Sequence, residues 1–382
     1  MRVLHVVTLV TPDCAFGGPT RVAVNLCSAL RDQGHDAIIA AGVSGFDEPP
    51  AEVGGVPAHL FPVRRAIPGM GYAATRAPAL DRWLKEHAPK FDIAHVHIGR
   101  DLVTLPAAAS LRRMRIPFVL QTHGMIEPGA HPLAPPIDWL WTSKVLRSAA
   151  MVLYLTSAEG RGLSAIGGSG LRLREFPNGV PTMAAADTDR RSSDLPEVLF
   201  MARLFERKRP EVFAEAALLL LRSGIRARFA IVGPSQGAEV GVDAIIAQAR
   251  KEGFGEGFIR REPGVPPDRA GERMASASIY ALPSLREPFG MTVVEALMLG
   301  VPVVICPDGG LAEFVRTKDC GLVAEGTPES FAQAISELLS DPRRASDMGR
   351  RGRSAVQSTF SIESVGRELE RIYGQILEQR SQ

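Results

Sequence analysis

Two carboxylates, Glu287 and Glu295, stand eight positions apart on either side of a predicted helix start. A buried strand expected at Ile279–Leu282 precedes them, and a Pro-Ser turn leads from this strand to the first acid. Eight residues of helix turn by about 800°, which leaves an offset of about 80°. With Glu287 still in the loop, both acids can therefore reach one ligand. Carboxylate oxygens accept hydrogen bonds from hydroxyls, so the pair suits a sugar or a ribose.

Glu295 also has a purely structural interpretation. It lies in an apolar helical stretch, between Val294 and Ala296. An unpaired acid there would be costly. Pairing with an Arg or Lys of the core is therefore the alternative to ligand binding.

Two cations, Arg203 and Lys208, follow a strand expected at 198–201. Pro210 suits the first turn of a helix, so Lys208 lies just ahead of that helix. Two cations between a strand end and a helix start could hold a diphosphate. The alternative is a solvated basic turn.

Two glycine pairs also follow predicted strands. Gly17 and Gly18 open the first predicted helix, where backbone N–H groups favour anions and glycine lets a ligand come close. Gly309 and Gly310 follow a strand expected at 302–306. Each pair could equally be a plain turn. The sequence contains neither a Gly-x-Gly-x-x-Gly dinucleotide motif nor a Gly-rich loop ending in Lys-Ser/Thr.

His97 and His123 are each expected just past the end of a strand, in the runs His-Val-His and Gln-Thr-His-Gly. A lone histidine is usually structural, but two at neighbouring strand ends suggest a substrate contact at His123. No third ligand with metal spacing accompanies them. Asp187 and Asp189 form an Asp-x-Asp that follows no strand, so a solvated loop is the expectation and no metal is predicted.

The order of elements predicts an α/β protein with two doubly wound parallel sheets, because strands alternate with helices. A polar stretch at 184–194 carries no periodicity and divides the chain into two similar halves. At 382 residues the chain is too long for one ordinary core. The polar residues above all fall at strand ends, which predicts one shared cleft. The expected strands span 2–10, 37–41, 60–63, 93–96, 118–121, 151–155, 198–201, 228–232, 258–260, 279–282 and 302–306, and the expected helices span 20–32, 77–86, 102–113, 137–148, 210–222, 244–251, 291–299, 328–339, 343–358 and 362–380.

The composition narrows the class of protein. Hydrophobic residues make up 45% and charged residues 23%, as in ordinary globular proteins. The net charge of +2 does not call for nucleic acid or an anionic membrane. Four cysteines without Cys-x-x-Cys spacing disfavour a zinc site or a disulfide framework and fit a reducing compartment. The apolar start of the chain is interpreted as a strand, not a signal peptide, and no run reaches the length of a transmembrane helix.

Taken together, these residues resemble the family-4 retaining glycosyltransferases of the GT-B fold, over almost the whole chain. The specific part is a series in the second half: Asn178-Gly179-Val180, Arg203 with Lys208, Pro283-Ser284, Glu287 with Glu295, Gly300-Val301-Pro302, and Gly309-Gly310 with Glu313. In the first half of the chain, the resemblance rests on His123-Gly124-Met125 and Gly17-Gly18. The resemblance implies a GT-B fold of two Rossmann-like domains facing a central cleft. It places the acceptor-binding domain at 1–180, the donor-binding domain at 181–360, and a C-terminal helix at 361–382 that crosses back to the first domain.

The same resemblance implies a role for each site residue. Arg203 and Lys208 hold the donor diphosphate and stabilise the charge that develops as it leaves, with backbone near Gly17 and Gly18 assisting. Glu295 hydrogen-bonds the ribose. Glu287 contacts the hydroxyls of the donor sugar, and N–H groups at Phe289, Gly290 and Met291 help to place it. His123 lies near the sugar on the acceptor side. The family needs no metal and no cofactor.

The expected reaction is transfer of a hexose, with retention, from a UDP- or GDP-sugar to a hydroxyl of a sugar, lipid-linked or small-molecule acceptor in polysaccharide, glycolipid or other glycoconjugate biosynthesis. Front-face attack is favoured over a carboxylate nucleophile, for which Glu127 is the nearest candidate. Two departures from the family leave the donor contacts open: Pro288 replaces a common Gly, and Arg209 replaces a Gly after the lysine. The alternatives are an epimerase-like enzyme of the same fold and a catalytically idle nucleotide-sugar-binding protein.

The expected location is the cytoplasm, and contact with the inner face of the membrane is left open. Basic and aromatic residues mix in two stretches, 64–83 and 139–147. Either could touch lipid or a lipid-linked acceptor. The alternative is an ordinary solvated face with some core aromatics.

Overall fold

The computed structural model describes residues 1–12, 17–65, 74–129, 134–183 and 195–381. The chain forms two compact units, 1–181 with 362–382 and 182–361. The boundaries expected from the sequence were 180/181 and 360/361. The polar linker predicted at 184–194, with Asp187 and Asp189, lies outside the described residues.

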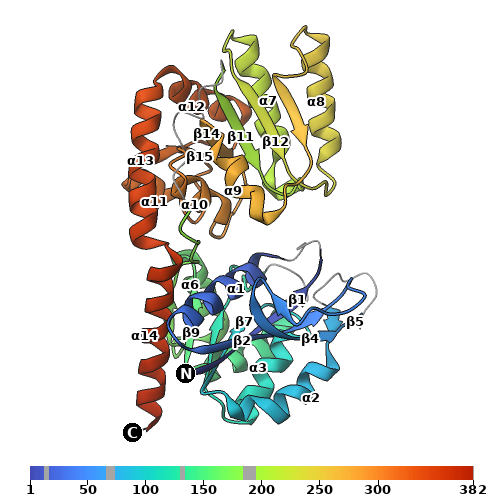
Figure 1. Cartoon of the computed structure of the whole chain (residues 1–382), viewed down its shortest axis with the longest axis vertical. Coiled ribbons are helices and arrows are strands. Elements are labelled where there is room, and N and C mark those ends of the chain that lie inside the picture. The colour runs from blue at the N-terminus through green and yellow to red at the C-terminus, as the bar shows by residue number, and fades with distance from the viewer. Residues whose placement is uncertain (13–16, 66–73, 130–133, 184–194, 382) are drawn as a thin grey trace. The chain divides into compact units, whose positions relative to one another are not determined.

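Unit 1 is built on an eight-stranded sheet in the order β10-β9-β8-β7-β1-β2-β4-β3, parallel except for β3. Helices cover both faces (Figure 1). The sheet order reverses between β1 and β7, because β2 and β4 continue to one side of β1 and β8 to β10 continue to the other side of β7. The elements are β1 (Arg2–Val10), α1 (Gly17–Asp32), β2 (Asp36–Val43), β3 (Glu52–Val53), β4 (Val56–Pro62), β5 (Arg64–Arg65), β6 (Thr75–Arg76), α2 (Pro78–His87), η2 (Ala88–Lys90), β7 (Ile93–His97), α3 (Thr104–Arg113), β8 (Phe118–Gln121), α4 (Ala134–Ile137), η3 (Asp138–Thr142), α5 (Ser143–Ser148), β9 (Met151–Tyr154), α6 (Ser157–Gly167), β10 (Leu173–Glu175) and α14 (Ile362–Ser381).

The last helix, α14, belongs to unit 1 and packs beside α1. His35 and Glu370 form an ion pair with 2.9 Å between Nε2 and Oε1, and Arg174 pairs with Glu368. Leu369 and Tyr373 are fully buried. The core of unit 1 therefore includes side chains from the end of the chain.

Unit 2 is a six-stranded parallel sheet in the order β13-β12-β11-β14-β15-β16. In chain order this is 3-2-1-4-5-6, the arrangement of a dinucleotide-binding sheet, and the order reverses between β11 and β14. Its elements are β11 (Glu197–Met201), η5 (Glu206–Lys208), α7 (Pro210–Arg222), β12 (Arg228–Val232), α8 (Glu239–Lys251), β13 (Ile259–Glu262), α9 (Pro267–Ala275), β14 (Ile279–Leu282), α10 (Met291–Met298), β15 (Val303–Ile305), α11 (Ala312–Thr317), β16 (Gly321–Val323), α12 (Pro328–Ser340) and α13 (Pro342–Thr359).

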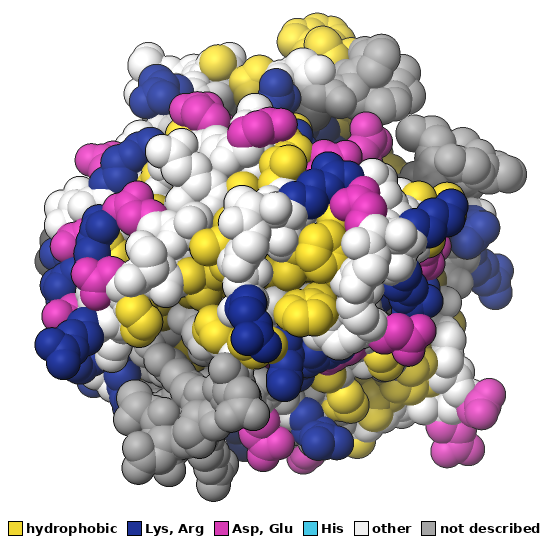
Figure 2. All heavy atoms as spheres, turned by 90° about the horizontal axis from the view of Figure 1, so that it is seen from above, with side chains coloured by type: hydrophobic (Ala, Val, Ile, Leu, Met, Phe, Trp, Pro, Cys, Tyr) yellow, Lys and Arg dark blue, Asp and Glu magenta, His cyan; other side chains and the backbone are white. Residues whose placement is uncertain are grey.

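The alternation of strands and helices predicted from the sequence is confirmed, and α7, β12 and β14 have the predicted bounds. The elements that were not predicted include α6, β10, α9, α11 and β16, together with short segments such as β3, β5 and β6. The buried strands explain the long apolar runs, because a parallel sheet is covered on both faces. On the face seen in Figure 2, basic and acidic side chains are interspersed, in keeping with the net charge of +2.

Candidate active site

The polar residues of unit 2 gather where the sheet order reverses. Lys208 follows β11, and Ser284 and Glu287 follow β14, which is the strand next to β11. Both strands are parallel, so their carboxyl ends meet at one edge of the sheet. Ligands of doubly wound sheets bind outside this edge at the reversal point.

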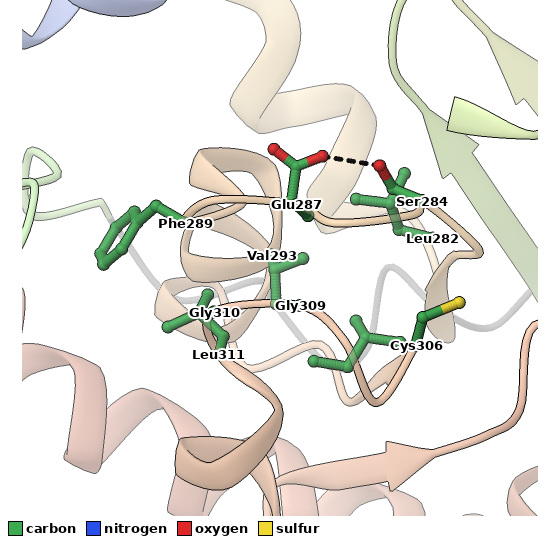
Figure 3. Close-up of a pocket in the computed structure, with 10 residues that line it drawn as sticks. Leu282, Ser284, Glu287, Phe289, Val293, Cys306, Gly309, Gly310 and Leu311 are labelled. Carbon is green, nitrogen blue, oxygen red and sulfur yellow. Dashed lines mark hydrogen bonds between the residues drawn. The ribbon is translucent and has the colours of Figure 1, made fainter. Parts of the chain in front are cut away.

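An ion pair joins Lys208 to Glu287. Both side chains are largely buried, with exposed fractions of 14% and 15%. The Ser284 hydroxyl donates to the same carboxylate oxygen, Glu287 Oε2, at 2.7 Å, as Figure 3 shows. One acid thus accepts from a cation and a hydroxyl at the end of β14.

The charge state of this pair follows from its surroundings. Burial alone would raise the pKa of Glu287, but Lys208 and the Ser284 hydroxyl outweigh it and hold the pKa below its ordinary value. Glu287 is therefore ionised at neutral pH, and an anionic acceptor and a cationic donor lie side by side at the site.

Local backbone geometry aims Lys208 at the site. The residue closes the short 3₁₀ turn η5, and Arg209 follows in the left-handed region with φ +53° and ψ +51°. Pro210 then opens α7. Left-handed backbone costs a side chain about 1–2 kcal/mol that glycine avoids. This position is the one where Arg209 replaces the glycine common in the family.

Backbone hydrogen bonds join three loops around the ion pair. Leu285 N donates to the Arg207 carbonyl at 3.0 Å, and Gly310 N donates to the Glu287 carbonyl at 2.8 Å. Asp308 Oδ2 accepts from Arg286 N at 2.9 Å. The loops after β11, β14 and β15 therefore form one unit, and the turn at Gly309-Gly310 is part of it.

A small pocket lies between the loops that follow β14 and β15. In Figure 3, Glu287 and Ser284 lie on one side, Gly309, Gly310 and Leu311 come from the loop after β15, and the Phe289 ring points away from Glu287. Phe289 is buried edge-on against Phe360, with ring centroids 5.4 Å apart. Gly290 precedes α10 with φ +79°, and Met291 begins the helix.

Arg203 and Glu295 take different positions. Arg203 is exposed, and its guanidinium lies over the Phe205 ring at 5.2 Å from the centroid. Glu295 is 4% exposed in the middle of α10. Tyr280 of β14 lies near both acids, since Glu287 and Glu295 each contribute to raising the pKa of its hydroxyl, although burial is the main cause. The structure therefore brings Lys208 and Glu287 into contact, whereas Glu295 is buried within α10, close to Tyr280.

The site residues predicted in unit 1 lie at its reversal point between β1 and β7 or at the end of the next strand, β8. Gly17 and Gly18 form the first turn of α1, directly after β1. A Cβ built on Gly18 would meet no atom within 4 Å, so packing within the chain does not demand glycine there. His123 follows β8. His97 was expected just past its strand, but it is the last residue of β7 and is fully buried.

The loop that carries His123 has strained backbone. His123 has φ +51° and Gly124 has φ +74°. Such a conformation persists only where the surroundings impose it. Glu159, at the start of α6, does this: its Oε1 accepts from Gly124 N at 2.6 Å and from the Thr122 hydroxyl, and its Oε2 accepts from Leu155 N at 2.7 Å.

Sequence reasoning missed Glu159, because α6 itself was not predicted. It also missed the partners of His123. His97 Nδ1 lies 2.8 Å from His123 Nε2, and His5 Nδ1 lies 3.0 Å from His97 Nε2. One feature of the sequence could have revealed this network: buried strands are usually apolar, yet histidines stand within two of the predicted strands or directly after them, at His5, His95 and His97.

A second feature of unit 1 is a group of exposed apolar side chains on the π-helical turn η3. Trp139, Leu140 and Trp141 are 75%, 51% and 47% exposed. Arg100 holds this turn in place: its Nε and Nη2 each donate to the Asp138 carboxylate at 2.8 Å, and Nη2 also donates to the Glu127 carbonyl at 2.9 Å. Glu127 lies in the loop after His123, so the turn is bonded to that loop.

In the other stretch expected to touch lipid, residues 64–83, the tryptophan packs against neighbouring rings. Trp83 is half-buried and packs between His59 and His87, with ring centroids at 4.8 Å in both cases. Met70 and Tyr72 lie outside the described residues. The Trp83 ring therefore packs against other rings of the same unit, at its surface.

In the described part of the chain, no group of three or more His, Cys, Asp or Glu side chains is arranged to hold a metal ion. Cys27, Cys306 and Cys320 are buried free thiols, and Cys14 lies outside the described residues. Among the described residues, no helix is long and apolar enough to cross a bilayer.

Known families match both halves of the chain. Residues 17–179 match the Glycosyl transferase 4-like domain, and residues 186–355 match Glycosyl transferases group 1. Among named relatives, the D-inositol 3-phosphate glycosyltransferase of Acidothermus cellulolyticus is 27% identical over 90% of this chain and 83% of its own length. The D-inositol 3-phosphate glycosyltransferase 1 of Catenulispora acidiphila is 29% identical over 66% of this chain and 65% of its own, so the match spans just under two thirds of that relative.

Solved structures give the fold. Anabaena Alr3699/HepE in complex with UDP has a TM-score of 0.79 at 18% identity, over 98% of this chain and all of that one. The sucrose-phosphate synthase of Thermosynechococcus elongatus has a TM-score of 0.78 at 18% identity, over 99% of this chain and all of that one. With the two domain matches, the two doubly wound sheets and the Lys208–Glu287 site at the reversal point, the chain belongs to the glycosyltransferases of the GT-B fold.

Proposed function

We propose that the chain transfers a hexose, with retention, from a nucleoside diphosphate sugar to a hydroxyl acceptor. The observation that carries the proposal is the Lys208–Glu287 pair at the reversal point between β11 and β14. A cation at that edge suits a diphosphate, and the adjacent carboxylate suits sugar hydroxyls. An idle binding protein would not need both groups paired and buried in one site.

Donor binding changes the partners of Lys208. In the free protein its ammonium is bound to Glu287. A diphosphate at the end of β11 would share that ammonium, and Glu287 would then accept from the hydroxyls of the donor sugar. As the bond to the sugar breaks, negative charge grows on the leaving phosphate, and Lys208 and Arg203 stabilise it. Ser284 keeps Glu287 oriented throughout, through Oε2.

The wider set of roles rests on the resemblance. Glu295 binds the ribose from α10, and Gly17 and Gly18 offer N–H groups to the diphosphate from α1. Neither role requires a metal ion. Retention proceeds by front-face attack, in which the leaving phosphate takes the proton of the acceptor hydroxyl.

UDP-glucose is the first donor to test, because a neighbour of the same fold was solved with it. Phosphorylated cyclitols are the first acceptors to test, because relatives are named for D-inositol 3-phosphate. Transfer is followed by release of UDP or GDP with and without acceptor, and the anomeric configuration of the product by NMR. Release that needs an acceptor and gives a product of retained configuration supports the proposal. A changed sugar in the recovered donor would favour the epimerase-like alternative.

We also propose that η3 contacts lipid or the apolar part of a lipid-linked acceptor. Two tryptophans and a leucine in consecutive helical positions cannot all face one core, and all three are exposed. Tryptophan favours the interface between water and lipid. The exposed Lys144, in the next turn, would meet anionic head groups. The cytoplasmic location expected from the sequence remains a prediction.

A further inference from the structure

Four histidine rings and a tyrosine form one hydrogen-bonded network in unit 1, in which His123 is partly exposed and the other members are fully buried. His5 comes from β1, His95 and His97 from β7, His123 from the loop after β8, and Tyr373 from α14. The rings of His95 and His97 stack with centroids 4.7 Å apart, and those of His97 and His123 at 5.0 Å. His5 is the register partner of His95 on the neighbouring strand. The network thus runs from the C-terminal helix to the strained loop that carries His123.

Every ring in this network is neutral at ordinary pH. Burial lowers the pKa of His5 and His123 to about 3. Burial, aided by the neighbouring histidines, also lowers the pKa of His95 and His97 well below the ordinary value. A neutral imidazole carries one N–H and one lone pair. Each nitrogen-to-nitrogen contact therefore has one donor and one acceptor, and the rings cannot choose their tautomers independently.

Two proton arrangements satisfy the contacts between rings. His97 meets His123 through Nδ1 and His5 through Nε2. If His97 donates to His123, it accepts from His5, and His123 keeps its proton on Nδ1. If His123 donates from Nε2, His97 donates onward to His5, and His123 Nδ1 carries a lone pair. No described residue is hydrogen-bonded to His123 Nδ1, so this atom is the one that a ligand would meet.

The far end of the network distinguishes the two arrangements. Tyr373 has one hydroxyl hydrogen and two neighbours, His95 Nδ1 at 2.6 Å and His5 Nε2 at 3.4 Å. In the second arrangement His5 donates to the tyrosine oxygen, the hydroxyl donates to His95 Nδ1 over the shorter contact, and His95 carries its proton on Nε2.

Gln121 supplies the remaining acceptor. Its amide Nε2 donates to Asn178 Oδ1 at 3.1 Å, which leaves its Oε1 as an acceptor. This oxygen and His95 Nε2 are both buried, and neither has a hydrogen-bond partner among the described residues. Gln121 interacts with the His95 ring in the sense that favours a proton on it. A proton on His95 Nε2 can therefore serve Gln121 Oε1, whereas a lone pair there would face another acceptor. In the first arrangement the single hydroxyl hydrogen of Tyr373 leaves a mismatch: if it goes to His5 Nε2, His95 Nε2 is a lone pair, and if it goes to His95 Nδ1, the lone pair of His5 Nε2 has no donor. Only the second arrangement gives every one of these contacts one donor and one acceptor.

We infer that this network fixes the tautomer of His123 so that Nε2 carries the proton and Nδ1 accepts hydrogen bonds from the hydroxyl of a sugar ligand. His5, His95, His97 and Tyr373 act as positioning residues, and they make the C-terminal helix part of the site. The inference about the ligand depends on the proposed glycosyl transfer, whereas the tautomer is a property of the free protein. The tautomer of a histidine is commonly set by the bond that its other nitrogen makes.

The test measures tautomers in the full-length protein labelled with ¹⁵N-histidine. Two-bond and three-bond ¹H–¹⁵N correlations distinguish Nδ1–H from Nε2–H rings, and a His123→Gln variant assigns the signal. Wild-type His123 is expected as the Nε2–H form between pH 6 and 8. Tyr373→Phe removes the hydroxyl that joins His5 to His95, so His123 should become a mixture of tautomers. The matched control is Tyr154→Phe, since Tyr154 is a half-buried tyrosine of β9 in the same unit.

Kinetics give a second readout. Tyr373→Phe should lower kcat for transfer by about tenfold with little change in the donor KM, and Tyr154→Phe should change neither. His97→Gln interrupts the chain of hydrogen bonds between His123 and His5. It should therefore lower kcat as Tyr373→Phe does. An Nδ1–H tautomer for wild-type His123, or a tautomer that survives Tyr373→Phe unchanged, overturns the inference. Absence of sugar transfer with an intact Nε2–H tautomer would count against the proposed function and leave the tautomer assignment standing.

Discussion

The Lys208 ammonium and the Glu287 carboxylate form a largely buried ion pair between the ends of two adjacent parallel strands, β11 and β14. Each residue belongs to a loop that is hydrogen-bonded to the other loop. The pair is therefore both part of the structure and available to a ligand, which makes its two contributions separable by experiment.

Lys208→Ala removes the cation proposed to stabilise the leaving diphosphate. We expect the rate of donor turnover to fall by about 100-fold or more, the magnitude typical of losing one preorganised electrostatic contact. Release of nucleoside diphosphate under saturating donor measures this rate. Lys251→Ala, at an exposed lysine of the same unit, is the control and should retain full activity. A Lys208→Ala enzyme within twofold of wild type would contradict the assignment.

Glu287→Gln keeps the shape of the side chain but leaves Lys208 buried without its counter-charge. We expect a loss of about 3 kcal/mol in the free energy of unfolding, since a broken buried pair leaves an uncompensated charge. Adding Lys208→Met should recover much of the loss, and a double-mutant cycle measured by denaturant unfolding gives the coupling energy. The exposed pair Arg222–Glu252 is the control, and its cycle should give a much smaller coupling.

Arg209→Gly tests the left-handed backbone between η5 and α7. Glycine adopts φ +53° without steric cost, so the variant should be more stable by a few tenths to about 1 kcal/mol. Arg209→Val, which is β-branched, should be clearly destabilised. Thermal melts of both variants beside Arg209→Ala separate backbone strain from loss of the guanidinium. If Arg209→Gly is less stable than Arg209→Ala, backbone strain does not decide the stability of the protein at this position.

Mild acid should destabilise unit 1. The histidines of the network remain neutral when folded but bind protons with a pKa near 6.5 when unfolded. The unfolded state therefore binds more protons below pH 6.5, and stability present above that pH is lost as pH falls. The loss is about 1.4 kcal/mol per pH unit for each such histidine. Unfolding at fixed temperature between pH 7 and pH 5 measures it, and a flat profile would contradict the buried neutral assignment.

Glu287 adds a loss at lower pH, since its folded pKa is depressed. Its contribution is fully present above the ordinary carboxyl pKa and is lost as pH falls through the folded value. Glu287→Gln should therefore flatten the stability profile below about pH 4.5 and leave the part above it unchanged.

Trp139→Ser with Trp141→Ser tests the lipid contact. The pair should reduce flotation with vesicles that contain anionic lipid, because it removes two exposed rings that favour the interface. Val240→Ser, at a comparably exposed apolar residue of α8, is the control and should not change flotation. If the wild-type protein does not float, contact of η3 with a lipid surface is excluded.

Most of the buried strands could be predicted, because buried parallel strands are continuous apolar runs. The helix α6 was missed because Gly160 and Gly162 interrupt its pattern, and α9 because its sequence is mostly polar. The residues after β11 and β14 could be predicted as a site, since the ends of parallel strands share an edge. The histidine network could not, because it depends on which strands are neighbours and on α14, whose partner lies far away in sequence.

The contribution of α14 to unit 1 has a consequence for biosynthesis. Tyr373 and Leu369 fill the core of a unit whose first residues leave the ribosome early. At about 5–20 residues per second, the roughly 200 residues that follow unit 1's first segment take on the order of 10–40 s to make. Until α14 has been made, unit 1 lacks the side chain of Tyr373 that contacts His5 and His95, so its core is completed only after the whole of unit 2 has been synthesised.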